Sequence, residues 1–120
     1  MKCFNLIILS FLLVSCSRQA CPGSVSIIRD TYKRHLIILK ESKHPKKLVS
    51  PKETQDAVYF LGVVSGISSK AEIGDIQSYR TKGDFIKDIK LWSDWYRKNR
   101  CKLTLRYVDS SFASAGLNWN

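Results

Sequence analysis

Residues 50–66 read SPKETQDAVYFLGVVSG, and this stretch decides the fold. Ser50 is a typical helix N-cap, a proline follows at the first helical position, and Glu53 completes a capping box. The apolar residues that follow recur at helical spacing, over a run too short to cross a bilayer. They predict a central core helix that ends at Gly66. The β-branched and aromatic content of residues 59–64 leaves a strand as the alternative.

Two further amphipathic helices are predicted, one on each side of this stretch. The first starts at Ser24 or Ser26, after a short turn-rich segment, and ends near Lys43. The second starts at a capping signal at Thr81 and runs to about residue 100. Both carry apolar residues at helical intervals: Ile28, Tyr32, Leu36 and Leu39 in the first, and Phe85, Ile89, Trp92 and Tyr96 in the second.

After the third helix the pattern changes. Apolar and polar residues alternate over residues 103–108, which is typical of a strand, and such a strand needs a partner such as residues 76–79. Small and polar residues follow, and residues 110–120 are expected to be a loosely ordered tail. The predicted fold is therefore mainly α: a small three-helix domain over residues 25–109 with a short C-terminal extended segment.

The first 15 residues are typical of an export signal. Residues 1–15 read MKCFNLIILSFLLVS, a basic start followed by a short apolar run. The next step, Leu13-Val14-Ser15-Cys16, resembles the lipobox of bacterial lipoproteins. That resemblance implies attachment of diacylglycerol to the Cys16 thiol, then removal of residues 1–15, with fatty acids such as palmitate on the cysteine, and a lipidated tether over residues 16–24. The alternative is an ordinary secretory signal.

The same resemblance gives an expected location. In lipoproteins of Gram-negative bacteria an aspartate after the acylated cysteine often retains the protein at the inner membrane, and this chain has Ser17 there. We therefore expect a lipid anchor in the cell envelope, at the outer membrane and facing the periplasm. The bilayer, reached through acylated Cys16, is the first expected partner.

The charge of the chain favours anionic partners. It has 20 Lys and Arg against 10 Asp and Glu, and loss of Lys2 with the signal leaves 19 against 10, a net charge of +9. Export makes nucleic acid a poor partner for such a basic domain. The densest cluster surrounds the end of the first helix and includes Lys43, Lys46 and Lys47. It either contacts an anionic surface or keeps the domain soluble.

The cysteines have separate expected fates. Cys3 leaves with the signal and Cys16 is acylated, so Cys21 and Cys101 remain in an oxidising compartment. We expect these two to form a disulfide that joins the tether to the end of the third helix. Two unpaired thiols are the alternative. Metal ligation is not expected, because no second thiol or histidine lies at a ligand spacing from either cysteine.

Residues 57–99 carry a second, local resemblance. A helix that ends in Ser65-Gly66, followed by Trp92-Ser93-Asp94-Trp95, is similar to helix pairs in bacterial HEAT-like repeat proteins, where Thr-Gly is common at the first position. The resemblance implies a helical interaction module without catalytic residues. Trp92, Trp95 and Tyr96 share one side of their helix and either contact a ligand or partner or form the core, with Trp95 expected to be partly exposed.

No catalytic, metal-binding or cofactor-binding constellation stands out. Asp84, Asp88 and Asp94 could supply a carboxylate pair, but each is better explained locally, Asp84 as a helix-start residue and the other two as solvated ion-pair partners of nearby lysines. The sequence therefore favours a membrane-anchored, non-enzymatic module that binds an envelope protein or an anionic envelope polymer. The alternative is a small envelope glycan hydrolase that uses two of the aspartates.

Overall fold

A computed structural model describes residues 21–71 and 79–118. This part of the chain is mainly helical, as predicted, and contains no strand. Its elements, in chain order, are α2 (Ser26–Ser42), α3 (Pro51–Ser65), α4 (Lys82–Asn99), the 3-10 turn η1 (Arg100–Lys102) and α5 (Leu105–Ser114). The signal segment, Cys16 and residues 76–78 of the expected strand partner lie outside the described residues.

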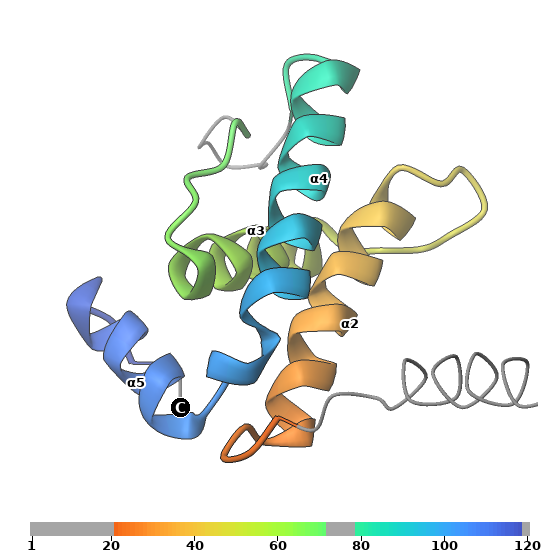
Figure 1. The fold of residues 1–120 in the computed structure, drawn as a ribbon. Helices are drawn as coiled ribbons and strands as arrows, with labels where there is room; N and C mark the ends of the chain where they lie inside the picture. The colour runs from red at the N-terminus through yellow and green to blue at the C-terminus, as the bar shows by residue number, and fades with distance from the viewer. Residues whose placement is uncertain (1–20, 72–78, 119–120) are drawn as a thin grey trace, which may run out of the picture.

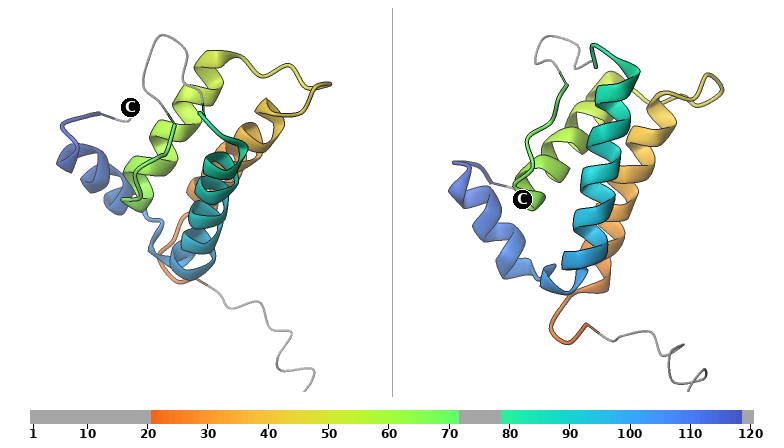
Figure 2. Two further views of the ribbon diagram at one scale, coloured as in Figure 1. Left: turned by 90° about the horizontal axis from the view of Figure 1, so that it is seen from above. Right: turned by 45° about the horizontal axis from the view of Figure 1, so that its top comes forward.

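Helices α2 and α4 lie side by side and run in opposite directions, and α3 crosses behind them (Figure 1). The start of α2, the turn η1 and the start of α5 therefore meet at one end of the bundle. The end of α2 and the start of α4 meet at the other. Figure 2 shows α5 set apart from the α2–α4 pair, on the side of α3.

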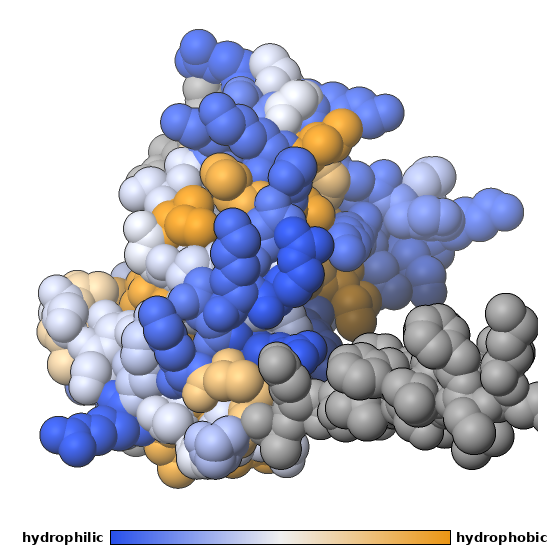
Figure 3. Space-filling view, in the orientation of Figure 1, coloured by the Kyte–Doolittle hydropathy of each residue, from blue (hydrophilic) through white to orange (hydrophobic). Residues whose placement is uncertain are grey.

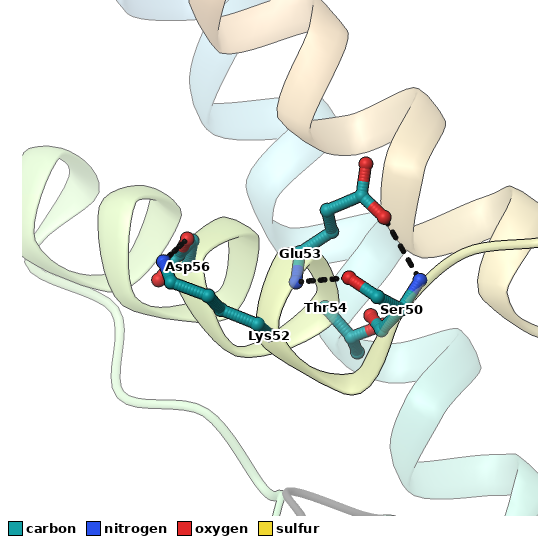
Figure 4. A network of polar contacts seen from close by, with 5 residues as sticks. All are labelled: Ser50, Lys52, Glu53, Thr54 and Asp56. Atoms are coloured by element: carbon teal, nitrogen blue, oxygen red, sulfur yellow. Dashed lines mark hydrogen bonds and ion pairs between the residues drawn. The ribbon is translucent and has the colours of Figure 1, made fainter.

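The start of α3 confirms the predicted capping box. The Ser50 hydroxyl accepts a hydrogen bond from the Glu53 backbone N–H at 3.2 Å, and the Glu53 carboxylate accepts one from the Ser50 N–H at 2.8 Å (Figure 4). These reciprocal bonds satisfy two donors that a helix start leaves unpaired. The helix ends where predicted, because Gly66 takes a left-handed conformation with φ of 70°. Residues 59–64 are therefore helical.

The core is built around Tyr32 of α2. Its side chain is fully buried and its ring contacts Phe60 of α3 and both Trp95 and Tyr96 of α4. Its hydroxyl donates to the backbone carbonyl of Trp92 at 3.0 Å. Burial raises the pKa of Tyr32 far above its usual value, so the phenol remains a neutral donor. The predicted apolar faces of the three helices meet at this residue.

The expected C-terminal extended segment is wrong. Residues 105–114 form helix α5, which also makes the first part of the expected tail helical. The Thr104 hydroxyl caps this helix by accepting from the Tyr107 N–H at 3.0 Å, and Val108 and Phe112, four residues apart, bury one face against the core. A strand over residues 103–108 would bury Leu103, Leu105 and Tyr107 on one face. Leu105 is instead 54% exposed.

The predicted disulfide is present and links Cys21 to Cys101 across a sequence separation of 80 residues. It joins the segment before α2 to the turn that follows α4. Beside it, the Val25 N–H donates to the Leu103 carbonyl at 3.1 Å. These two links hold the beginning of the described chain against the end of the α4 helix.

Candidate functional site

A cavity of about 360 Å³ lies where the end of α2 meets the start of α4. We call it the basic aromatic pocket. Of the described residues that line it, three are cations, two are aromatic and none is acidic; the set is Lys43, Tyr79, Arg80, Thr81, Lys82, Phe85 and Ile86. Lys43 comes from the residue that follows α2, and the other six come from the start of α4 and the segment before it.

The start of α4 positions the aromatic residues of this pocket. The Thr81 hydroxyl caps α4 by accepting from the Asp84 N–H at 3.0 Å, which begins the helix where the sequence predicted. Phe85 in the first turn packs edge-on against Tyr79, with ring centroids 5.3 Å apart. The Lys43 ammonium lies over both rings, 5.7 Å from the Phe85 centroid and 6.0 Å from that of Tyr79.

Asp88 holds Tyr79 in place from inside the domain. Its side chain is fully buried, and one carboxylate oxygen accepts three hydrogen bonds, from the Tyr79 hydroxyl at 2.8 Å, the Ser69 hydroxyl at 2.8 Å and the Lys70 backbone N–H at 2.7 Å. Burial and the bond to Asp88 hold the pKa of Tyr79 above its usual range, so this phenol stays a donor. The expectation that Asp88 is a solvated ion-pair partner is therefore wrong.

The electrostatics of the pocket favour an anionic group with an aromatic or apolar portion. Lys43 and Lys82 are exposed, so their charged ends can reach a ligand, and Arg80 between Tyr79 and Thr81 is exposed as well. The rings of Tyr79 and Phe85 and the side chain of Ile86 supply the apolar part of the lining. Figure 3 shows a mainly hydrophilic face over α2 and α4, with groups of apolar side chains between the hydrophilic ones.

The predicted basic residues are only partly brought together. Lys43 lines the pocket, whereas Lys46 and Lys47 lie exposed in the connector that follows. Lys47 pairs with Glu41 at 3.5 Å, an exposed contact of small energetic value. Sequence reasoning missed Tyr79, Arg80, Lys82 and Phe85. Two cations beside a predicted N-cap could have indicated an anion-binding surface. The sequence does not show that they approach Lys43, which lies some 40 positions away.

The three aromatic residues predicted as contacts belong largely to the core. Trp92 is fully buried and donates from Nε1 to the Ile67 carbonyl at 3.3 Å, so it presents no surface to a partner. Trp95 and Tyr96 are half-buried, and their rings stack on Tyr32 at centroid distances of 5.4 and 5.3 Å. Partial exposure of Trp95 agrees with the prediction.

The aspartates of α4 do not converge on a cleft. Asp84 lies in the first helical turn, Asp88 is buried, and Asp94 pairs on the surface with Lys90 at 2.7 Å and Arg97 at 2.8 Å. The hydrogen bond from Lys90 lowers the pKa of Asp94, so that carboxyl is an ionised surface group. None of the three lines a cavity described here.

Two other cavities are less suited to a charged ligand. One, of about 510 Å³, runs between α3 and α5 and is lined mainly by small and apolar residues around Gly62 and Ser111. The other, of about 310 Å³, lies between α2, α3 and α5 beside His35, Asp56 and Phe112. Burial lowers the pKa of His35, which keeps the imidazole neutral at pH 7.

Within residues 21–71 and 79–118, no group of three or more His, Cys, Asp or Glu side chains is arranged to hold a metal ion. In the same ranges no helix has the length and apolarity needed to cross a bilayer. Comparison with protein-family models, with curated proteins and with solved structures found no match for this chain. The lipobox-type signal and the HEAT-like resemblance therefore stay predictions.

Proposed function

We propose that this chain is a lipid-anchored envelope protein that acts as a non-enzymatic binding module. Acylated Cys16 would hold it at a membrane of the bacterial envelope, the outer membrane with the domain facing the periplasm. The basic aromatic pocket would bind an anionic group of an envelope protein or envelope polymer. No cofactor or metal takes part.

One observation carries the binding proposal. Three cations from two distant parts of the chain, Lys43 on one side and Arg80 and Lys82 on the other, surround one cavity, and none of the described residues that line it is acidic. Like charges repel, so the convergence of Lys43 and Lys82 on one cavity is unfavourable unless an anion or solvent compensates it. The rings of Tyr79 and Phe85 lie beneath the Lys43 ammonium. They also offer an apolar surface that an apolar part of a ligand can contact.

The anchoring proposal has separate support. Leu13-Val14-Ser15-Cys16 follows an apolar run of signal-peptide length. The link between Cys21 and Cys101 fits an oxidising compartment outside the cytoplasm, where disulfides persist. Glycan hydrolysis gains no such support, because Asp88 is inaccessible to a substrate and Asp84 and Asp94 lie on different parts of α4.

Site-specific photo-crosslinking in intact cells tests the binding role. A photoreactive amino acid replaces Ile86, which lines the pocket and is 53% exposed; the control replaces Ile37 of α2, also 53% exposed but not a lining residue. We expect a reproducible adduct with an envelope protein or polymer from position 86 and not from position 37.

Loss of charge gives the matched test. The pocket triple variant, Lys43→Gln/Arg80→Gln/Lys82→Gln, should abolish the adduct formed from position 86, because three charge-assisted contacts disappear together. An adduct that persists unchanged in this variant would reject the pocket as the binding site.

Metabolic labelling with a palmitate analogue tests the anchor. The wild-type protein should be labelled and should fractionate with membranes, whereas Cys16→Ser should lose the label. An unlabelled mature protein whose N-terminus is not residue 16 would reject the lipid anchor and leave the pocket proposal to be judged on crosslinking alone.

A further inference from the structure

The end of the bundle opposite the basic aromatic pocket has its own surface chemistry. Cys21 is bonded to Cys101, and Val25 is hydrogen-bonded to Leu103, so the segment before α2 and the segment before α5 lie together. Figure 1 shows the start of α2, the 3-10 turn and the start of α5 at this lower end. We call it the disulfide end.

Two large aliphatic side chains are exposed at the disulfide end. Ile27, in the first turn of α2, is 68% exposed, and Leu105, the first residue of α5, is 54% exposed. Neither belongs to the hydrophobic core. Apolar atoms are also visible at the lower edge of the molecule in Figure 3. An exposed aliphatic side chain is ordinary by itself, but these two lie among an unusual set of charges.

Basic side chains predominate at this end, although Asp109 follows on α5. Arg100, Lys102 and Arg106 are exposed, and the stretch from residue 97 to residue 108 contains five Lys or Arg and no Asp or Glu. The acidic residue nearest to Ile27 along α2, Asp30, pairs with Lys33 at 3.8 Å. The disulfide end therefore combines a mainly basic surface with exposed aliphatic groups.

We propose that the disulfide end is a bilayer-contact surface, which docks on the anionic headgroups of the membrane that holds the anchor. Arg100, Lys102 and Arg106 contact lipid phosphates, and Ile27 and Leu105 enter the boundary between headgroups and acyl chains. Cations beside apolar side chains are the combination that interfacial membrane proteins use. The inference rests on the lipid anchor proposed for Cys16.

The length of the tether favours the bilayer over an acidic protein as the partner of this end. Five residue steps separate Cys16 from Cys21, a reach of at most about 17 Å even when fully extended. The disulfide passes this restraint on to Cys101 and its basic neighbours. A surface held this close to headgroups meets them at high effective concentration, whereas a soluble partner must compete for the same narrow space.

The same geometry separates the two basic regions of the molecule. Helix α2 has 17 residues and is therefore about 25 Å long. It begins at the disulfide end and stops at the basic aromatic pocket. When the disulfide end rests on the bilayer, the pocket points away from it, towards partners in the envelope space. One end then serves the membrane and the other serves the ligand.

Vesicle binding tests the proposal on the chain from residue 16 with Cys16→Ser, so that acylation does not dominate. Cosedimentation uses vesicles of phosphatidylcholine with 30% phosphatidylglycerol and vesicles of phosphatidylcholine alone. The disulfide-end triple variant is Arg100→Gln/Lys102→Gln/Arg106→Gln. Each cation near an anionic surface strengthens binding roughly fivefold, so this variant should bind the anionic vesicles roughly a hundredfold more weakly.

The pocket triple variant is the matched control, because it removes the same charge from the opposite end. We expect it to retain vesicle binding to within roughly fivefold. Equal loss in both triple variants would show that only net charge matters and would overturn the proposal. A larger loss in the pocket triple variant, or no binding of the parent chain to anionic vesicles, would overturn it as well.

A second pair of variants tests the aliphatic contacts. Ile27→Ser/Leu105→Ser should weaken binding to the anionic vesicles roughly tenfold, whereas Ile37→Ser/Ile86→Ser, which removes similarly exposed side chains elsewhere, should not. Equal binding by the two variants would remove the aliphatic part of the proposal. Circular dichroism of each variant checks that the helices are retained.

The outcomes also separate this proposal from the proposed function. The disulfide-end triple variant keeps the pocket intact and should still give the crosslinked adduct from position 86 in cells. The pocket triple variant should lose that adduct and keep its vesicle binding. The two surfaces lie at opposite ends of α2. A negative result in the vesicle experiment therefore does not contradict the crosslinking result, and a negative crosslinking result does not contradict vesicle binding.

Discussion

The two halves of α4 carry similar residues and pack differently. In the C-terminal half, Trp92 is buried and the rings of Trp95 and Tyr96 stack on Tyr32. In the N-terminal half, Phe85 packs at the edge of the core but, unlike Trp92, is only partly buried, and its ring faces Tyr79 and the Lys43 ammonium. An aromatic residue at helical spacing becomes core where neighbouring helices close over it, and surface where they do not.

A covalent bond also stabilises the packing around the C-terminal half of α4. The disulfide lies just beyond the end of α4 and has no counterpart among the described residues at the pocket end. The buried, cross-linked end should therefore dominate stability, and the open end should tolerate change. Four predictions test this contrast, beginning with the largest expected effect.

Removal of the disulfide should have the largest effect. The variant Cys21→Ser/Cys101→Ser should lower the free energy of unfolding by about 4–5 kcal/mol, because the bond closes a loop of 80 residues in the unfolded chain. Urea denaturation followed by circular dichroism measures this difference. Reduction of the wild-type protein with a thiol should reproduce it. A loss below about 1 kcal/mol would show that noncovalent packing alone holds this end.

Truncation of one aromatic residue in each half compares them directly. Trp92→Ala should lower the free energy of unfolding by about 4 kcal/mol, since it empties a fully buried site. Phe85→Ala should lower it by only about 1 kcal/mol, because the ring is partly exposed. The same urea denaturation measures both. Equal values would contradict the contrast between the two halves.

Asp88 tests how the open end keeps its shape. Asp88→Ala should lower the free energy of unfolding by about 2–3 kcal/mol, because three donors lose their common acceptor. It should also speed proteolysis near Tyr79, which that carboxylate holds. Asp88→Asn retains an acceptor oxygen and should do less. The surface control Asp94→Ala should change stability by no more than about 1 kcal/mol. Similar values for Asp88→Ala and Asp94→Ala would contradict a structural role for Asp88.

The smallest expected effect is the pH dependence of stability that comes from the partly buried His35 of α2. Burial lowers the pKa of His35 below the 6.5 of an exposed histidine, so the unfolded chain binds a proton that the folded chain refuses. Stability should therefore fall as pH drops below 6.5, by no more than about 1.4 kcal/mol per pH unit for one proton. His35→Gln should flatten the profile from pH 7 to 5. If His35→Gln leaves the pH dependence of stability unchanged, that dependence comes from other titratable groups.

The helices were largely predictable because their signals are local. The capping box at Ser50, the N-cap at Thr81 and the terminating Gly66 act through bonds between residues at most four apart. The pairing of Cys21 with Cys101 was also predictable, because the expected export signal and the expected acylation of Cys16 would leave only two thiols. Helix α5 was missed because Thr104 offers a cap only if Val108 and Phe112 find a core to bury against.

By itself, the sequence determined the mainly helical fold, the positions of three helices, the disulfide and the basic character of the surface. Each follows from short-range backbone chemistry or from composition. Only the tertiary structure decided that Asp88 is buried, that Trp92 is core and that Lys43 meets Phe85. The physical reason is that burial and long-range contact depend on which helix covers which face, and helical periodicity leaves that choice open.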